Sequence, residues 1–285
     1  MFVPRKLLEE KLKQILAEDI GQGDVTAAAI VPPNLMVEAE VIAKEQGIAA
    51  GIEEATVLAE YLGLKVKANV ADGQKIKNKQ VLMQISGDAQ TILSVERTLL
   101  NLVSRMSGIA TKTRLLTEKL EKANVKARIA ATRKAAPGLL YFDKKAVIIG
   151  GGDPHRLHLD DMVLIKDNHL AIVGSVEEAV KKAKANASFS KKIEVEVTKA
   201  EDAVKAAKAG ADIIMLDNFS PQQAKAAGEA LRKAGFGDVL LEVSGGITAE
   251  NLLEYAAAEV DVLSMGELTH SVRALDVSLE IVKGK

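Results

Sequence analysis

The sequence predicts an α/β protein whose C-terminal part is an α/β barrel or an open α/β sheet. Six apolar, β-branched runs lie beyond residue 107, and from the second run onward alanine-rich helical segments separate them. This repetition predicts buried parallel strands joined by helices. Residues 1–107 mix strand and helix patterns without the same rhythm and therefore predict a separate α/β domain. The length of 285 residues suits one large and one smaller domain.

The N-terminal elements follow from hydrophobic periodicity and turn residues. Helices are predicted over residues 4–18, 51–63 and 94–123, the last broken near Gly108, and strands over 36–46, 64–70 and 81–86. The stretch GQGDVTAAAI at 21–30 and the polar stretch at 71–80 are interpreted as turns.

The six later runs end in a common way. Almost every run finishes in a polar residue or a glycine; the runs are ARIAAT, DMVLIKD, KIEVEVT, DIIMLDN, VLLEVSG and VDVLSMG, at 127–132, 161–167, 192–198, 212–218, 239–245 and 260–266. In an α/β barrel these ends form one rim, where catalytic groups lie. Charges at the ends of apolar strands are costly unless they face a site or each other. A dinucleotide-binding sheet is disfavoured, because no GxGxxG follows the first strand.

Composition excludes several classes of function. There is no cysteine, which removes disulfides, cysteine-ligated zinc and thiol catalysis. The formal net charge of -1 and the aromatic content of 3% give no reason to expect nucleic-acid or anionic-membrane binding. The N-terminus lacks the apolar core of a signal peptide, and no apolar run approaches membrane-spanning length. We therefore expect a cytoplasmic enzyme or binding protein.

Five potential cations cluster within one strand–helix–strand unit of this near-neutral chain: Arg133, Lys134, His155, Arg156 and Lys166. Arginine recognises carboxylate or phosphate in a planar bidentate manner, and lysine adds a point charge. The pattern predicts a ligand with several negative charges; a solvated basic face is the alternative. The neighbouring glycines at 150–152 predict either a backbone cradle for an anion or a flexible turn.

Glu196 and Asp217 end neighbouring strands, and two such carboxylates suit Mg²⁺ held largely through water and substrate oxygens. A structural network with Lys166 or Lys134 is an alternative. The glycine-containing ends SGGI and GELTHS predict a phosphate cradle of backbone N–H groups, with Ser244, Gly245, Gly246, Gly266 and His270 as its candidates. Arg97 falls off the apolar stripe of its helix, which by itself indicates only a solvated arginine.

Taken together, the motifs resemble the quinolinate phosphoribosyltransferase family nearly from end to end. They are EDIGQGDVT, ERTLLNLVSRMSGIAT, TRKxxPGL, GGGxxHR, LIKDNH, EVEV, LDNF, SGGI and GELTHS, in this order. The resemblance implies an N-terminal α/β open sandwich over 1–107, an incomplete α/β barrel over 108–270, and a C-terminal helix over 271–285 that packs back on the first domain. It also implies a Mg²⁺-dependent reaction in which quinolinate and 5-phosphoribosyl 1-pyrophosphate give nicotinate mononucleotide, pyrophosphate and CO₂.

By the same resemblance, quinolinate would be held by Arg133, His155, Arg156 and Lys166, with Lys134 between the two substrates. Glu196 and Asp217 would hold the ribose hydroxyls and the metal, and Lys134, Lys166, Glu196 and Asp217 would be the catalytic groups. Ser244, Gly245, Gly246, Gly266 and His270 would take the 5-phosphate. Arg97 would enter the neighbouring subunit's quinolinate site, which implies a homodimer, with a hexamer as the larger alternative.

The chain departs from the family pattern near the predicted acid pocket. It carries Ala135 and Leu140 where TRKTxPGLR is common, and Pro154 before His155 where GGGxNHR is common. Two other functions are considered: a nicotinate phosphoribosyltransferase that does not decarboxylate, and a non-catalytic barrel that binds a phosphate sugar. The first needs only one carboxylate site, so five cations would be surplus; the second does not need Glu196 or Asp217.

Overall fold

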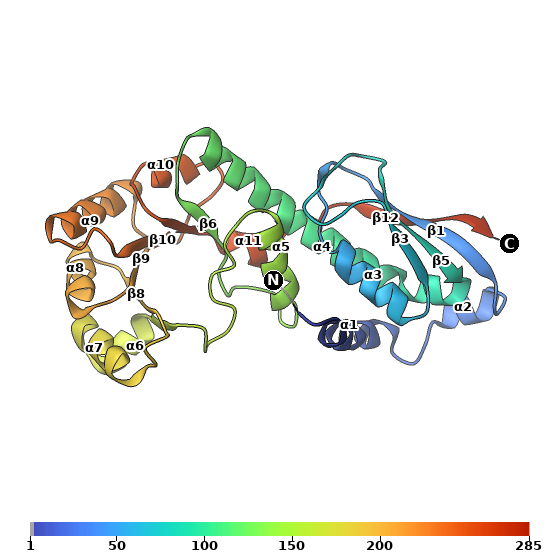
Figure 1. Cartoon of the computed structure of the whole chain (residues 1–285), viewed down its shortest axis with the longest axis horizontal. Coiled ribbons are helices and arrows are strands. Elements are labelled where there is room, and N and C mark those ends of the chain that lie inside the picture. The colour runs from blue at the N-terminus through green and yellow to red at the C-terminus, as the bar shows by residue number, and fades with distance from the viewer. Residues whose placement is uncertain (1–2, 285) are drawn as a thin grey trace. The chain divides into compact units, whose positions relative to one another are not determined.

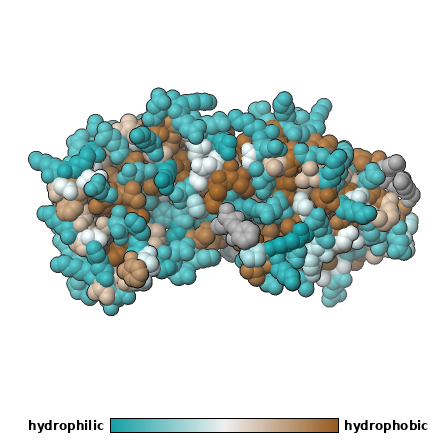
Figure 2. Space-filling view, viewed as in Figure 1, coloured by the Kyte–Doolittle hydropathy of each residue, from teal (hydrophilic) through white to brown (hydrophobic). Residues whose placement is uncertain are grey.

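The computed structural model describes residues 3–284, and the chain divides into two compact units. Residues 1, 2 and 285, where the predicted domains begin and end, lie outside the described residues. Within 3–284 no helix is both long and apolar enough to cross a membrane. The face drawn in Figure 2 is mostly hydrophilic, with smaller apolar areas among its polar residues.

The first unit contains residues 3–114, 141–151 and 272–284 and is built on an antiparallel sheet of order β12-β1-β5-β3. Helix α3 contacts β3, β5 and α1, so helices pack on this sheet (Figure 1). Its elements are α1 (Arg5–Ile20), α2 (Val25–Ile30), β1 (Met36–Ala43), β2 (Gly47–Ile48), α3 (Ile52–Tyr61), β3 (Lys65–Ala68), β4 (Lys75–Ile76), β5 (Val81–Asp88), most of α4 (Ala89–Lys122), α5 (Leu140–Ile149) and β12 (Val277–Gly284).

Two local predictions in this unit were wrong. The stretch predicted as a turn at 21–30 contains α2, because Asp24 caps it by accepting from the N–H groups of Thr26 and Ala27. The predicted break at Gly108 is absent from the continuous helix α4. A Cβ at Gly108 would lie 2.2 Å from the carbonyl oxygen of Arg273, so this glycine permits the C-terminal segment to approach the helix.

The C-terminal segment belongs to the first unit but is not the predicted helix. Residues Val277–Gly284 form β12, which pairs antiparallel with β1 from Ala43 to Val37. The β-branched Val277, Ile281 and Val282 favour an extended strand, and the edge of β1 supplies its hydrogen-bonding partners. The predicted boundary at 107/108 falls inside α4, and residues 141–151 also join the first unit.

The second unit contains residues 115–140 and 152–271 and confirms all six predicted strands. Its elements are β6 (Arg128–Ala130), β7 (Val163–Ile165), α6 (Asp167–Val173), α7 (Val176–Asn186), β8 (Ile193–Val197), α8 (Ala200–Ala209), β9 (Ile213–Asp217), α9 (Pro221–Lys233), β10 (Leu240–Ser244), α10 (Leu252–Ala256), β11 (Val262–Ser264) and α11 (Glu267–His270). The strands form one parallel sheet of order β6-β11-β10-β9-β8-β7. Figure 1 shows the helices between them on the outer side.

The strand order identifies an incomplete barrel. The first strand, β6, pairs with the last, β11, whereas β6 and β7 are the two edges of the sheet. At the β6 edge the loop around Asp153 forms a parallel bridge with Ala130. The Asp153 N–H donates to the Ile129 carbonyl at 2.7 Å, and the Ala131 N–H donates to the Asp153 carbonyl at 3.0 Å. The loop that carries His155 and Arg156 is therefore tied to the sheet.

Candidate active site

A cavity of about 470 Å³ lies at the carboxyl ends of the parallel strands in the second unit. Both its position and its polar lining match the rim predicted from the strand ends. Eight of the residues predicted for the site line it: Arg133, Lys134, His155, Arg156, Lys166, Glu196, Asp217 and Ser244. They come from six different strand ends or loops, so the fold assembles a site that is dispersed in the sequence.

Strand alternation turns several of these side chains to the same face of the sheet. Residues two apart on a strand share a face, as do Glu194 and Glu196 on β8, Met215 and Asp217 on β9, and Glu242 and Ser244 on β10. The register pairs Met215 with both Glu196 and Glu242, and pairs Asp217 with Ser244 nearer the strand ends. The interior layers of such barrels are usually filled by apolar branched side chains. Here Glu194 and Glu242 are fully buried acids.

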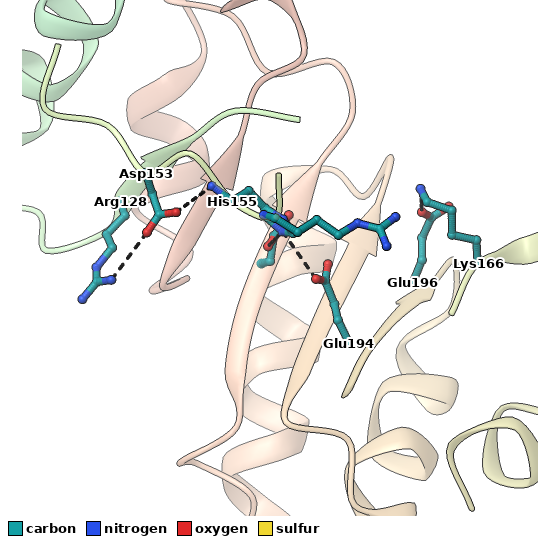
Figure 3. A network of polar contacts seen from close by, with 8 residues as sticks. Arg128, Asp153, His155, Lys166, Glu194 and Glu196 are labelled. Atoms are coloured by element: carbon teal, nitrogen blue, oxygen red, sulfur yellow. Dashed lines mark hydrogen bonds and ion pairs between the residues drawn. The ribbon is translucent and has the colours of Figure 1, made fainter. Parts of the chain in front are cut away.

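Lys166 and Glu196 form the most direct charge contact at the rim. The Lys166 ammonium donates to Glu196 Oε2 at 2.8 Å (Figure 3). The backbone N–H of Lys166 donates to His169 Nδ1 at 2.9 Å, so His169 holds the start of α6 immediately after β7. The Lys166 side chain is thereby directed toward the cavity. There an anionic ligand could replace Glu196 as the partner of its ammonium group.

Two guanidinium groups stand close together in the same cavity. Burial and the positive charge of Arg133 both lower the pKa of Arg156, although an arginine stays charged at physiological pH. The carboxylates of Glu194 and Asp161 act in the opposite direction. Like charges held together in a partly buried cavity repel each other, and an anion bound between them relieves that repulsion. The geometry therefore favours a ligand that carries carboxylate or phosphate groups.

Glu196 and Asp217 are the carboxylates predicted to hold a metal. Both line the cavity, and Asp217 Oδ2 accepts from the side-chain amide of Asn218 at 2.8 Å. Oxygen donors of this kind fit Mg²⁺ that keeps water and substrate oxygens as its other ligands. Two groups of three potential ligands also occur among residues 3–284: His155 with Glu194 and Glu242, and Glu53 with Glu54 and Asp72.

The predicted phosphate loops lie next to the cavity residues. Gly245 has φ 96°, and a Cβ there would lie 2.2 Å from Asn218 Oδ1, so only glycine fits. On the other loop, Thr269 Oγ1 donates to the Lys134 carbonyl at 2.7 Å, and a Cβ on Gly266 would meet His270 Cδ2 at 3.0 Å. Of the predicted phosphate contacts, Ser244 itself lines the cavity. Gly245, Gly246, Gly266 and His270 adjoin it as parts of these two turns.

Two sequence expectations concern residues of the first unit. The side chain of Arg97 on α4 is 65% exposed and lies 4.0 Å from Glu96. Gly150, of the triple glycine, serves close packing: a Cβ there would lie 2.5 Å from Thr113 Cβ on α4. The Gly150 and Gly151 N–H groups donate to the carbonyls of Ala146 and Ile148, so neither is directed at an anion in this structure. Arg114 donates to the Gly150 carbonyl at 3.0 Å, which ties the end of α5 to α4.

Sequence reasoning missed the buried carboxylates beneath the rim. The imidazole Nε2 of His155 lies 3.2 Å from Glu242 Oε2 and 3.4 Å from Glu194 Oε2. The signal was present, because each acid interrupts an otherwise apolar run, IEVEV or LLEVS, at an inward-facing position. Only their convergence on His155 required the tertiary structure.

Comparison with known proteins identifies one family over both units of the chain. The family model "Quinolinate phosphoribosyl transferase, N-terminal domain" matches residues 24–107, and its C-terminal counterpart matches residues 109–280. A probable nicotinate-nucleotide pyrophosphorylase [carboxylating] of Methanocaldococcus jannaschii is 48% identical, with 95% of this chain and 96% of that protein covered. The corresponding protein of Methanothermobacter thermautotrophicus is 45% identical, with 95% and 97% covered. The solved nicotinate-nucleotide pyrophosphorylase of Francisella tularensis superimposes with a TM-score of 0.89 at 35% identity, and 98% of each chain is covered.

Proposed function

The chain belongs to the quinolinate phosphoribosyltransferase family, and from that membership we propose how its cavity carries out the reaction. The enzyme transfers the phosphoribosyl group of 5-phosphoribosyl 1-pyrophosphate to quinolinate with decarboxylation, which yields nicotinate mononucleotide, pyrophosphate and CO₂ in NAD biosynthesis. The observation that carries the proposal is the cavity at the ends of the parallel strands, in which cationic side chains meet the carboxylates of Glu196, Asp217 and Glu242.

We assign the cationic side of the cavity to quinolinate. Arg133, His155, Arg156 and Lys166 would receive its two ring carboxylates, with Arg97 added from a second subunit. The proximity of the Arg133 and Arg156 charges supports this role, because a dianion between them would relieve their repulsion. Lys134, on the loop after β6, would lie between the two substrates.

The acidic side of the cavity, which meets the cationic side at the Lys166–Glu196 contact, would bind 5-phosphoribosyl 1-pyrophosphate. Glu196 and Asp217 would hold the ribose hydroxyls and Mg²⁺, which when bound neutralises charge on the pyrophosphate. The turns that contain Ser244, Gly245, Gly246, Gly266 and His270 would receive the 5-phosphate through backbone N–H groups and side chains. The positive φ values of Gly245 and Gly246, 96° and 65°, support close approach of this backbone to a ligand.

The chemistry requires orientation and charge stabilisation more than a covalent nucleophile. Attack of the pyridine nitrogen on the anomeric carbon passes through a cationic, oxocarbenium-like state, and Glu196 and Asp217 would stabilise that positive charge. Lys134 and Lys166 would offset the negative charge of the departing pyrophosphate and of the ring carboxylates. Once the ring nitrogen is cationic, its charge stabilises the electron pair left on the ring carbon when the 2-carboxylate departs as CO₂, and a proton from water then bonds to that carbon.

The role of Arg97 implies a dimer in which each subunit completes its partner's site. Its exposed side chain supports this proposal. Mixing R97A and K134A subunits tests it, because only the mixed dimer regains one intact site, with about a quarter of the wild-type activity expected from symmetry. No recovery after mixing would refute the shared site. Sedimentation of the wild type would separate dimer from hexamer.

We place the enzyme in the cytoplasm, where its two anionic substrates would be available. The absence of cysteine from the sequence is compatible with a reducing compartment. Fractionation of source cells with an antibody to this chain would test the location, and recovery in a membrane or secreted fraction would contradict it.

The decisive experiment offers quinolinate and nicotinate separately with 5-phosphoribosyl 1-pyrophosphate and Mg²⁺, and records CO₂ and nicotinate mononucleotide. Turnover of quinolinate with CO₂ release is expected. Turnover of nicotinate instead would mean that the departures at Ala135, Leu140 and Pro154 have changed the acid pocket. E196A and D217A should lose turnover; unchanged rates would favour a binding barrel. Omission of Mg²⁺ should also abolish turnover if the metal assignment is correct.

A further inference from the structure

Two fully buried carboxylates lie under the cationic side of the cavity and face one imidazole. Glu194 on β8 and Glu242 on β10 flank β9, and both approach Nε2 of His155, the Glu242 contact being the shorter at 3.2 Å. Figure 3 shows Glu194 pointing toward His155, whereas Glu196, two residues later on β8, lies beside Lys166. The three side chains form a compact group, here called the His155 clamp.

Burial of the two carboxylates of the His155 clamp lowers the stability of the fold, which suggests that the clamp serves the site. Within residues 3–284, Glu194 Oε1 and Oε2 and Glu242 Oε1 have no hydrogen-bond partner. A buried carboxylate without donors is strongly destabilising, and apolar side chains of similar volume would serve the barrel core better. His155 Nε2 lies closest to both acids and, together with the Arg156 charge that acts on Glu194, offsets part of the cost of burying them.

The other atoms of His155 are also fixed. Its φ of 53° lies in the left-handed region, which is strained for a residue with a side chain. The His155 N–H donates to Asp153 Oδ1 at 2.7 Å, and Nδ1 accepts from the Arg156 N–H at 2.7 Å. Because Nδ1 accepts, Nε2 carries the ring proton and directs it at the two carboxylates.

We infer that Glu242, together with Glu194, is a positioning residue that holds the His155 imidazole and thereby fixes the His155–Arg156 pair for the ring carboxylates of quinolinate. This inference rests on the proposed roles of His155 and Arg156. The acids act through the histidine, as carboxylates do when they orient a histidine that binds metal or substrate. Without the Glu242 carboxylate, Nε2 loses its charged hydrogen-bond acceptor, and the attachment of the strained loop is weakened.

The electrostatics support this arrangement. Burial alone would lower the pKa of His155, but Glu194 and Glu242 raise it to about 10. The Arg156 N–H points at Nδ1 and opposes a second ring proton there. This effect competes with the two carboxylates, which favour the doubly protonated ring. A proton on Nε2 is common to both protonation states. The buried carboxylates would repel a dianionic ligand, and the proton on Nε2 reduces that repulsion because it lies close to them.

The test uses E242Q in the full-length enzyme, with E259Q as a matched control at an exposed glutamate. We expect E242Q to weaken quinolinate binding and raise its KM by about tenfold or more, with the KM for 5-phosphoribosyl 1-pyrophosphate nearly unchanged. In the H155N background the same substitution should have no further effect, because the interaction is carried by His155. Equal losses in both backgrounds, or no loss in either, would overturn the inference.

A second measurement does not depend on activity or on the folding of E242Q. The sequence has four histidines, so ¹⁵N spectra of the free wild-type enzyme can be assigned to His155 by comparison with H155N. We expect Nε2 to remain protonated in neutral buffer, without tautomer averaging. An unprotonated or averaged Nε2 would refute the clamp even if quinolinate binds. Conversely, if Nε2 is protonated but the enzyme does not bind quinolinate, the proposed function would be wrong and the geometry of the clamp would still be supported.

Discussion

Lys145 should be indispensable to the first unit because it neutralises a carboxylate that water cannot reach. Its ammonium donates to Glu54 Oε1 at 2.6 Å and also contacts Glu53. The side chains of Lys145 and Glu54 are 8% and 0% exposed, whereas that of Glu53 is 61% exposed. Burial opposes the charge on Lys145, but Glu54 and Glu53 raise its pKa well above the ordinary value. Replacement of Lys145 by Met keeps most of the volume and removes the charge.

The size of the effect follows from the protonation of Glu54. Burial already raises the pKa of Glu54 above 4.5 although Lys145 opposes it, and without Lys145 the buried carboxyl would take up a proton. Keeping that group neutral near pH 7 costs about 3 kcal/mol, in line with the ~3–5 kcal/mol typical of broken buried ion pairs. Because the folded pKa is raised, the loss in K145M should grow as pH rises from 4.5 and be less than about 1 kcal/mol near pH 5.

Urea unfolding followed by circular dichroism at pH 5 and pH 7.5 measures this loss. K44M is the matched control, because Lys44 pairs with Glu280 at 2.7 Å on the surface of the same unit, and loss of an exposed pair should change the stability little. Replacing both Lys145 and Glu54 by Met should recover much of the stability. An equal loss for K145M at both pH values would refute the reasoning, as would a loss no larger than that of K44M.

Three further outcomes are expected. G108A should destabilise the fold by ~1–3 kcal/mol in urea unfolding, because its Cβ would lie 2.2 Å from the Arg273 carbonyl oxygen; a neutral result would mean that the C-terminal segment yields without cost. The pKa of His155 is raised to about 10 against an ordinary 6.5, so its stabilisation should be complete below pH 6.5 and decline toward pH 10, and H155N should remove this slope. S220A should cost ~1 kcal/mol, because the Ser220 hydroxyl caps α9 by accepting from the Gln223 N–H at 3.2 Å, whereas S190A should serve as a nearly neutral control in the same unfolding measurement.

Much of the candidate site was predictable because its residues stand at recognisable strand ends. Glu196, Asp217 and Ser244 each close an apolar run, and parallel strands bring such ends to one rim whatever the lengths of the helices between them. The cavity that they share with Arg133, Arg156 and Lys166 is the expected consequence. Local periodicity sufficed here, since each strand is specified by its own residues.

The sequence by itself therefore determined the α/β class, the six parallel strands, the charged rim and the family. Only the tertiary structure decided that Gly108 and Gly150 serve close packing, that residues Val277–Gly284 form a strand on β1, and that Glu194 and Glu242 converge on His155. The physical reason is that periodicity and capping are interactions within one element. Close approach, sheet pairing and the sharing of a buried proton join residues far apart in the chain, and no local pattern specifies which residue will be the partner.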